Sequence, residues 1–333
     1  MQDKKLYDAV ALGELLADLT EVKTDADGYP TLESHPGGAP ANYLAALAKF
    51  GAETAMIGKV GADAFGRALR ATLEKAGVDT RGVIVDENVF TTLAFVTLDE
   101  AGNREFSFAR KPGADTRLAE EELDFDIIGA SRVFHFGTLS LTDEPARTAT
   151  KRAVEYAKER GVTVTFDPNL RKPLWRDLNE AKKQMLWGLS QADIVKISDE
   201  EIDFLFGCSP EDGAARIIDD FGAKLVFATC GEKGCYYKNR NASGSVTALS
   251  GVRAVDTTGA GDIFGGSAVW RWLQTGKSAE ELDGDELREI ALFAAAVAGL
   301  STEKPGGISS VPSLSEVTEK LRAASQTVHF DKF

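Results

Sequence analysis

The chain has 333 residues, 43% of them hydrophobic, and carries a formal net charge of −14. Its length is enough to bury the core of one large α/β domain. The acidic charge argues against nucleic acid or an anionic membrane surface as the main partner, because both attract a basic face.

Neither a membrane segment nor a disulfide framework is predicted. The N-terminal residues lack the apolar core of a signal peptide, and the longest apolar run, 290–300, is shorter than the roughly 20 residues that span a bilayer. Three cysteines are too few for a disulfide framework, and no histidine lies near them in the sequence to complete a zinc site. We therefore expect a cytoplasmic protein.

An acidic residue interrupts the apolar N-terminal part of the chain. Residues 8–12 form a short apolar run that ends at Gly13, which is typical of a buried strand. The apolar pattern resumes at 15–20, where Asp18 is the exception. A solvent-facing side chain and a ligand contact explain Asp18 equally well at this point.

A glycine turn opens the first predicted helix. Gly37 and Gly38 precede an alanine-rich run, and the helix is expected to end at Gly51. Asn42 lies in the first turn although asparagine is a poor helix former. We interpret Asn42 either as an N-terminal hydrogen-bonding residue or as a ligand contact.

Strands alternate with helices along most of the chain, which predicts an α/β fold with a doubly wound, mostly parallel sheet and helices on both faces. A predicted hairpin interrupts this alternation, with strands at 91–99 and 104–110 around a turn at 100–103. Together with residues 15–36, the hairpin region 88–112 indicates a small separate sheet. Such a sheet could act as a lid over a binding site.

Large apolar residues recur in the hairpin at Leu93, Phe95, Phe106 and Phe108. Their alternation along the strands predicts one apolar face on the small sheet. A second subunit that covers this face would make the protein a homodimer.

Three polar residues follow the predicted strand at 162–167. Asp167, Asn169 and Arg171 stand at its carboxyl end, where open α/β sheets bind their ligands. A proline turn with a capping aspartate is the alternative explanation for these residues.

Two further loops carry weaker indications of a ligand. The strand at 192–198 is followed by acidic residues up to Glu201, which charge stabilisation of a helix N-terminus would also explain. Thr229 and Gly231 lie in a glycine turn between two strands and could face a phosphate, although a hairpin needs no ligand.

The loop at 255–262 is the strongest functional signal in the sequence. Gly259 and Gly261 lead directly into an apolar helix. The free N–H groups and the dipole of a first helical turn bind anions. Asp262 lies in the same turn and would repel a resting phosphate, so it indicates a base that takes a proton from an attacking hydroxyl. This combination predicts a kinase that acts on an alcohol.

Two other phosphate-binding motifs are excluded by their spacing. The next glycine is Gly265, one residue later than the dinucleotide-binding fingerprint requires. The triplet at 276–278 would need a glycine at position 271 to form a P-loop, and the sequence has Arg271. The remaining alternative is a glycine turn that caps a buried helix, with Asp262 as a partner of the helix dipole.

Two segments resemble the signature motifs of the ribokinase-like (PfkB) carbohydrate kinases. Gly37-Gly38 with Asn42 is similar to the N-terminal motif, and residues 256–262 are similar to the C-terminal one. The resemblance extends over essentially the whole chain and implies one ribokinase-like kinase domain at 1–325, with the lid inserted in it. Within the family, residues 13–16 and 36–42 are most similar to bacterial fructokinases, followed by ketodeoxygluconate kinases.

The resemblance implies roles for residues in both motifs and between them. Asp262 is implied as the catalytic base, with the amides of Gly259, Ala260 and Gly261 as the anion hole. The implied sugar-binding residues are Asp18, Gly37, Gly38, Asn42, the lid arginine Arg110, and Arg171. The implied nucleotide-binding residues are Asn169, Lys196, Thr229, Gly231 and Gly234.

The expected cofactors are ATP and Mg²⁺. The magnesium-linked motif of the family is Asn-x-x-Glu, and this chain keeps the glutamate as Glu201 but has Ser198 in place of the asparagine. Glu201 is therefore the implied metal-linked residue. A monovalent cation such as K⁺ near Asp256 and Thr258 is a further candidate.

The expected function is that of an ATP-dependent sugar kinase that converts fructose to fructose 6-phosphate. A 2-keto-3-deoxygluconate kinase is the alternative within the family, but a sugar acid would need cationic partners beyond Arg110 and Arg171. A sugar- or nucleotide-binding regulator without turnover is the alternative of another class. Asp262 argues against it, because a binding module has no need of a carboxylate beside its anion hole.

Overall fold

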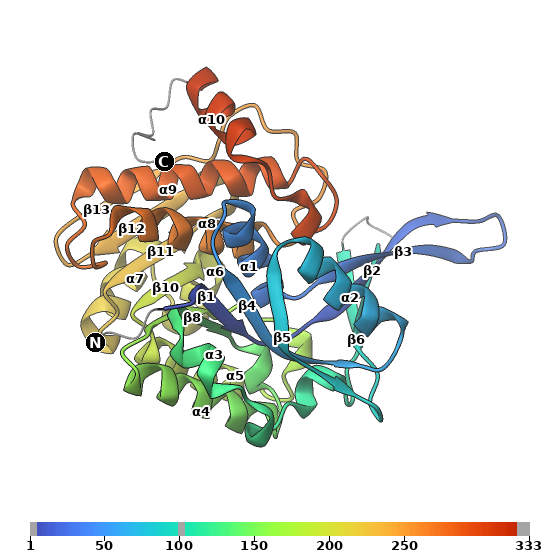
Figure 1. Ribbon diagram of the computed structural model, residues 1–333. Coiled ribbons are helices and arrows are strands. Elements are labelled where there is room, and N and C mark those ends of the chain that lie inside the picture. Colours follow the sequence, from blue (N-terminus) through green and yellow to red (C-terminus); the bar gives the residue numbers. More distant parts are fainter. Residues whose placement is uncertain (1–4, 99–103, 325–333) are drawn as a thin grey trace.

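The main sheet collects strands from most of the chain. Figure 1 shows the computed structural model, which describes residues 5–98 and 104–324. The strands of this sheet are β1 (Tyr7–Leu12), β4 (Thr54–Gly61), β5 (Val78–Asp86), β8 (Ser131–Gly137), β9 (Thr163–Asp167), β10 (Ile194–Ser198), β11 (Leu225–Thr229), β12 (Cys235–Asn239) and β13 (Ser243–Val246). They lie in the order β13-β12-β11-β10-β9-β8-β1-β4-β5. The strands from β11 to β5 are parallel, and the pairs β11-β12 and β12-β13 are antiparallel. The predicted mostly parallel sheet is confirmed.

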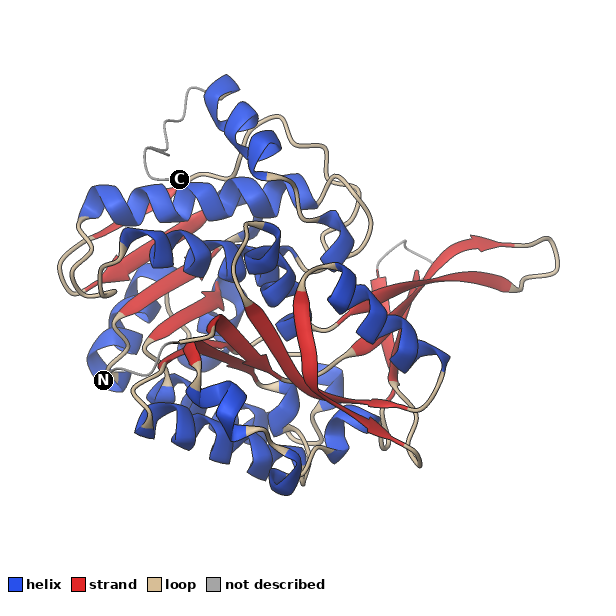
Figure 2. Ribbon diagram, in the orientation of Figure 1, coloured by secondary structure: helices blue, strands red, loops and turns tan. Residues whose placement is uncertain are grey.

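Helices cover both faces of the main sheet (Figure 2). The helices of one core are α1 (Ala39–Lys49), α2 (Ala64–Lys75), α8 (Ala260–Thr275), α9 (Gly284–Ser301) and α10 (Leu314–Ala323). Those of the other core are α3 (Phe125–Gly129), α4 (Ala146–Glu159), α5 (Leu178–Gln191), α6 (Asp199–Phe206) and α7 (Pro210–Phe221). In the described part of the chain, no helix has the length and apolarity needed to cross a bilayer.

The central strands are buried because they are apolar along almost their whole length. Every position of β4 is buried, and in β8 only Arg132 is exposed. Parallel strands with helices on both faces require such runs. Because these strands are parallel, their carboxyl ends meet at one edge of the sheet. That edge carries the loops after β1, β9, β10 and β11, which hold the predicted site residues Asn169, Arg171, Gly231 and Gly234.

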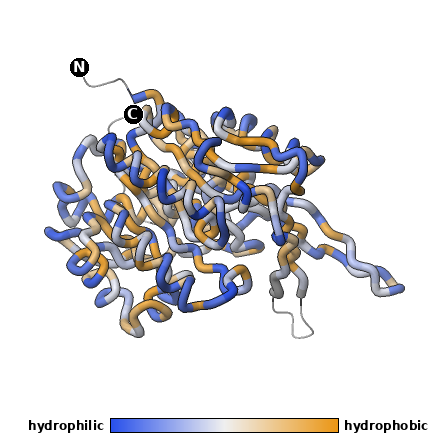
Figure 3. Tube along the Cα trace, turned by 90° about the horizontal axis from the view of Figure 1, so that it is seen from below, coloured by the Kyte–Doolittle hydropathy of each residue, from blue (hydrophilic) through white to orange (hydrophobic). Residues whose placement is uncertain are grey.

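A smaller sheet stands apart from the main one, as predicted. Its strands are β2 (Leu16–Thr24), β3 (Pro30–Gly37), β6 (Thr92–Leu98) and β7 (Arg104–Ala109), in the order β3-β2-β6-β7. β2 and β6 are parallel and the outer pairs are antiparallel. The predicted turn at 100–103 lies outside the described residues. The β2–β3 arm projects from the body in Figure 1, and its tip is hydrophilic in Figure 3.

The register of β6 against β7 corrects the expected apolar face of this sheet. Phe108 pairs with Ala94, which is the neighbour of Phe95 along the chain. Directly paired residues share a face of a sheet, and neighbours along a strand alternate between faces. Leu93 and Phe95 therefore lie on one face, and Phe106 and Phe108 lie on the other. The prediction of a single face carrying all four residues is wrong.

Helices α1 and α8 pack closely because a glycine lies at their contact. A Cβ atom on Gly266 would come within 2.2 Å of the Tyr43 carbonyl oxygen. At the adjacent Gly265 the nearest atom, Tyr43 Cδ2, would be 3.6 Å away, which is an ordinary contact. Gly266 therefore sets how near the two helices approach, and their N-terminal turns carry Asn42 and Asp262.

We expect Gly266→Ala to lower the free energy of unfolding by about 1–3 kcal/mol, because the added methyl group pushes α1 and α8 apart. Gly265→Ala is the matched control. It should leave stability unchanged or raise it by up to about 1 kcal/mol, since alanine favours a helix over glycine. Chemical denaturation of both variants measures the difference. Equal stabilities would contradict the role of Gly266.

Candidate active site

The loop before α8 leaves backbone N–H groups free at the start of that helix. Gly259 precedes the helix with a φ of 75°, a conformation that favours glycine. Ala260 N donates to Thr257 O at 3.3 Å, whereas the amides of Gly261 and Asp262 find no acceptor among the described residues. Free amides at the positive end of a helix dipole are suited to binding an anion.

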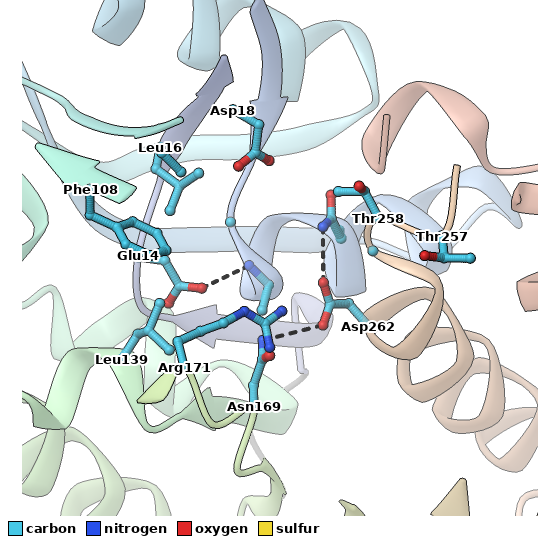
Figure 4. Close-up of a pocket in the computed structure, with 15 residues that line it drawn as sticks. Glu14, Leu16, Asp18, Phe108, Leu139, Asn169, Arg171, Thr257, Thr258 and Asp262 are labelled. Carbon is cyan, nitrogen blue, oxygen red and sulfur yellow. Dashed lines mark hydrogen bonds between the residues drawn. The ribbon is translucent and has the colours of Figure 1, made fainter. Parts of the chain in front are cut away.

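Asp262 is buried and held by two side-chain amides (Figure 4). Asn42 Nδ2 donates to its Oδ2 at 2.9 Å, and Asn169 Nδ2 donates to its Oδ1 at 3.4 Å. Burial raises the pKa of this carboxyl above its ordinary value, while the hydrogen bond from Asn42 and the charges of Lys196 and Arg171 oppose the rise. A carboxylate with a raised pKa and a fixed orientation is suited to take a proton from a hydroxyl.

A cavity of about 340 Å³ lies beside Asp262. The predicted residues that line it are Asp18, Gly38, Asn42, Asn169, Arg171, Gly259 and Asp262. The lining residues that the sequence analysis did not name as ligand contacts are Glu14, Leu16, Ala39, Ala94, Phe108, Leu139 and Thr257, and Thr258, expected near a monovalent cation, completes the wall. The small sheet contributes Asp18, Ala94 and Phe108, so this sheet forms one wall of the cavity.

Gly37 acts on this cavity through Asp18 and does not line it itself. A Cβ atom at position 37 would lie 2.2 Å from Asp18 Oδ2. The glycine therefore leaves room for the carboxylate. Its predicted direct contact with the sugar stays a prediction.

A second cavity, of about 620 Å³, also borders the start of α8. Three predicted nucleotide residues, Thr229, Gly231 and Gly234, line it together with Ala260 and Gly261. Other parts of its wall, none of which the sequence analysis singled out, are Glu232, 248–252, Ala254, Phe264, the α9 residues Ala295, Ala298 and Gly299, and Thr302 just after α9. Thr257 lines both cavities.

Lys196 lines neither of these two cavities. Its ammonium group lies 3.0 Å from Asp167 Oδ2, and a Cβ atom on Gly261 would be 2.9 Å from Lys196 Nζ. The lysine thus lies against the anion-binding turn, paired with a buried aspartate. The expected direct contact with the nucleotide stays a prediction.

Arg110 is likewise paired with a buried carboxylate. Its side chain is buried, its Nε donates to Asp115 Oδ2 at 2.8 Å, and its two terminal nitrogens donate to Thr142 Oγ1 and the Leu139 carbonyl oxygen, both at 2.8 Å. Arg110 is not among the residues that line the 340 Å³ cavity. The guanidinium is thus held by Asp115 in this structure, and the expected contact between the lid arginine and the sugar stays a prediction.

Glu201 is engaged by the backbone on both carboxylate oxygens. Leu170 N donates to Oε1 at 2.7 Å, and Ser198 N donates to Oε2 at 2.9 Å. Ser198 in turn caps α6, accepting from Glu201 N at 3.2 Å. The serine that replaces the family asparagine therefore has a structural role. Within the described residues, no group of three or more His, Cys, Asp or Glu side chains is placed to hold a metal ion.

Asp256 ties the α8 loop to the segment before α10. Its Oδ1 accepts from Thr258 N at 3.0 Å and from Thr258 Oγ1 at 2.7 Å, and its Oδ2 accepts from Gly306 N at 2.9 Å. These bonds hold the loop in place. They also occupy the carboxylate near which a monovalent cation was expected.

The comparisons with known proteins agree with this site. Residues 7–314 match the model of the pfkB family carbohydrate kinases. The chain is 42% identical to Fructokinase-1 of Zea mays over 318 residues, which cover 95% of this chain and 98% of that protein. A fructokinase with bound ATP from Xylella fastidiosa superposes with a TM-score of 0.88 at 30% identity, covering 96% of this chain and 100% of that one.

A second solved structure carries both kinds of ligand. It is a fructokinase from Vibrio cholerae in fructose, ADP and calcium ion bound form, with a TM-score of 0.81 and 31% identity over 95% of this chain and 99% of that one. The family model and the maize relative both extend over nearly the whole chain. The chain therefore belongs to the pfkB family of carbohydrate kinases.

Proposed function

We propose that this protein is an ATP-dependent fructokinase that transfers the γ-phosphate of ATP to the 6-hydroxyl of fructose. The observation that carries the proposal is the position of Asp262 at the start of α8. Asp262 lines the smaller cavity, and its neighbours Ala260 and Gly261 line the larger one. The smaller cavity has polar side chains suited to sugar hydroxyls, and the larger one is walled by small and apolar residues suited to a nucleotide. The choice of fructose is supported by the fructokinases that match the chain over nearly its whole length.

Asp262 acts as the general base in this proposal. As the hydroxyl oxygen attacks the γ-phosphorus, its proton passes to the Asp262 carboxylate, and the bond between the γ-phosphorus and the leaving oxygen of ADP breaks. Asn42 and Asn169 keep the carboxylate oriented. The free amide of Gly261 and the α8 dipole stabilise the charge on the phosphoryl group in transfer.

Mg²⁺ neutralises the charge of the ATP phosphates when it is bound. Because backbone N–H groups already occupy both oxygens of Glu201, we propose that this residue holds Mg²⁺ through water molecules, which this ion retains in most protein sites. A monovalent cation near Asp256 and Thr258 remains a prediction.

The charge of the smaller cavity favours a neutral sugar over a sugar acid. Among the described residues that line it, Arg171 is the only cation. Arg110 is committed to Asp115. A 2-keto-3-deoxygluconate substrate would need a cationic partner for its carboxylate, so it stays the alternative substrate.

We further propose that the small sheet closes as a lid within one kinase domain, because it already forms a wall of the sugar cavity. Leu93 and Phe95, on the face opposite Phe108, are the apolar surface that a second subunit would cover. A cytoplasmic location is supported by the three free cysteines, Cys208, Cys230 and Cys235.

Assays of ADP release with fructose, glucose, ribose and 2-keto-3-deoxygluconate test the proposed substrate. We expect the highest kcat/KM for fructose. A preference for the keto acid of tenfold or more, about 1.4 kcal/mol, would replace fructokinase by the alternative within the family.

Asp262→Asn tests the general base in the same assay. The variant should lose at least about a hundredfold in kcat and keep its ATP affinity, because the amides of the α8 turn remain in place. ATP binding is measured by calorimetry. Retention of more than about a tenth of the wild-type kcat would show that Asp262 is not the base.

Asp18→Asn should weaken fructose binding and stabilise the free enzyme at high pH. Burial raises the pKa of Asp18 to about 7, with contributions from Asp262 and Asp256 and opposed by Arg171. The pKa of an aspartate in the unfolded chain is about 3.9, so the folded state binds the proton more tightly. Part of the free energy of unfolding is therefore lost as the pH rises from about 4 to 7. The variant removes that loss.

The Tm difference between Asp18→Asn and wild type should therefore be larger at pH 8 than at pH 5. The KM for fructose should rise about tenfold to a hundredfold and the KM for ATP should stay nearly constant. Asp27→Asn, in the exposed tip of the β2–β3 arm, is the control. A Tm difference that is the same at both pH values would refute the account of Asp18.

The proposed subunit contact predicts a dimer in light scattering at micromolar concentration. Phe95→Glu should shift the protein to a monomer, because it places a charge on the apolar face of the lid. Ala26→Glu at the arm tip should remain dimeric. A monomeric wild type would exclude the contact.

A further inference from the structure

Glu14 lines the sugar cavity and has no role in the mechanism described so far. It lies between β1 and β2, where the chain passes from the main sheet to the small one. Only 3% of its surface is exposed, although glutamate is almost never buried without a partner. A buried carboxylate in a binding cavity needs donors for both of its oxygens.

The protein supplies Glu14 with backbone donors, its own N–H group and that of Ala39. Ala39 N, at the start of α1, donates to Glu14 Oε1 at 2.8 Å, and Gly38 before it has no side chain that could cap the helix. No other residue in the described ranges, 5–98 and 104–324, donates a hydrogen bond to this carboxylate. An ionised carboxylate accepts up to about four hydrogen bonds, so Glu14 keeps acceptor capacity for a ligand.

The charged groups near Glu14 do not neutralise it. Arg110 is the neighbouring cation, and its guanidinium is bound to Asp115 at 2.7 and 2.8 Å. Burial raises the pKa of Glu14 to about 7, Asp115 adds to the rise, and the Ala39 hydrogen bond and Arg110 oppose it. At pH 8 the carboxylate is therefore negatively charged, and it forms no ion pair with a residue of the described ranges.

Glu14 and the catalytic base lie at different ends of the cavity. In Figure 4, Glu14 lies with Phe108 and Leu139 on one side, and Asp262 lies on the other. The base must stand beside the hydroxyl that receives the phosphate, which is the 6-hydroxyl in the proposed reaction. A fructose that extends across the cavity from Asp262 would have its C1 end on the Glu14 side. That end is a hydroxymethyl group in fructose and a carboxylate in 2-keto-3-deoxygluconate.

We propose that Glu14 is a specificity-determining residue that accepts a hydrogen bond from the hydroxyl at the C1 end of a neutral ketohexose and repels a carboxylate at the same place. This inference rests on the proposed function. A hydroxyl supplies a further donor to the buried carboxylate, whose remaining lone pairs can accept it, whereas an ionised acid supplies only acceptors and a like charge. Specificity obtained in this way combines an attraction with a repulsion.

The first test is the selectivity of Glu14→Gln at pH 8. The amide keeps an oxygen to accept from Ala39 N and loses the charge. We expect the ratio of kcat/KM for 2-keto-3-deoxygluconate to that for fructose to rise at least tenfold over wild type. Glu121→Gln, at an exposed carboxylate outside the cavity, is the matched control and should leave the ratio unchanged. A ratio for Glu14→Gln within twofold of wild type would leave Glu14 as a helix cap only.

The second test uses the wild-type enzyme and does not depend on the stability of a variant. 1-Deoxyfructose lacks the hydroxyl that Glu14 is proposed to bind. Its kcat/KM should be at least about tenfold below that of fructose, as expected for loss of a hydrogen bond to a charged group. An equal kcat/KM for the two sugars would overturn the proposed contact.

The two proposals fail in different ways. A wild-type preference for the keto acid refutes the assignment of fructose. The inference on Glu14 is judged by the change in the ratio between wild type and Glu14→Gln, and by the comparison of fructose with its deoxy analogue.

Discussion

The burial of Asp262 is the constraint on which the rest of the site depends. A buried carboxylate is costly unless it is hydrogen-bonded, and its partners here, Asn42 and Asn169, lie 220 and 93 positions away in the chain. Helix α1 can bring Asn42 to α8 because Gly266 leaves the two helices room to approach. The β9 loop brings Asn169 because parallel strands end at a common edge. The orientation of Asp262 is therefore set by distant parts of the fold and not by its own loop alone.

The fold and part of the site were predictable because their signals are local. Buried parallel strands must be apolar, so the alternation of strands and helices was visible in the sequence. Gly259 and Gly261 predicted a helix start with free amides. Asp262 indicated a catalytic base, because a carboxylate is unusual in an anion-binding turn. Asp18 and Asn42 drew attention as polar residues in apolar segments. Asp18, Asn42 and Asp262 each differ in polarity or charge from what their immediate surroundings favour, and all three line the 340 Å³ cavity.

Interactions between distant parts of the chain were not predictable in this way. An arginine directly after a strand, such as Arg110, is common and predicts no particular partner. Its pairing with Asp115 depends on how the small sheet packs against the rest of the domain. Lys196 likewise pairs with Asp167 on the neighbouring strand. The two faces of the hairpin depend on register, and a slip of one residue exchanges them. The small α9 residues of the larger cavity have the composition of any buried helix, so nothing in the sequence marked them.

Thr257 contributes to the walls of both cavities, so the proposed sites for sugar and nucleotide share a residue. If one ligand favours a particular conformation of Thr257, the other ligand binds to a cavity with Thr257 in that same conformation. Thermodynamic linkage requires the effect to be reciprocal: whatever factor the sugar applies to nucleotide affinity, the nucleotide applies to sugar affinity. Substrate synergy in this enzyme would thus need no separate regulatory site, and the abundance of one substrate would set the threshold concentration at which the other is captured.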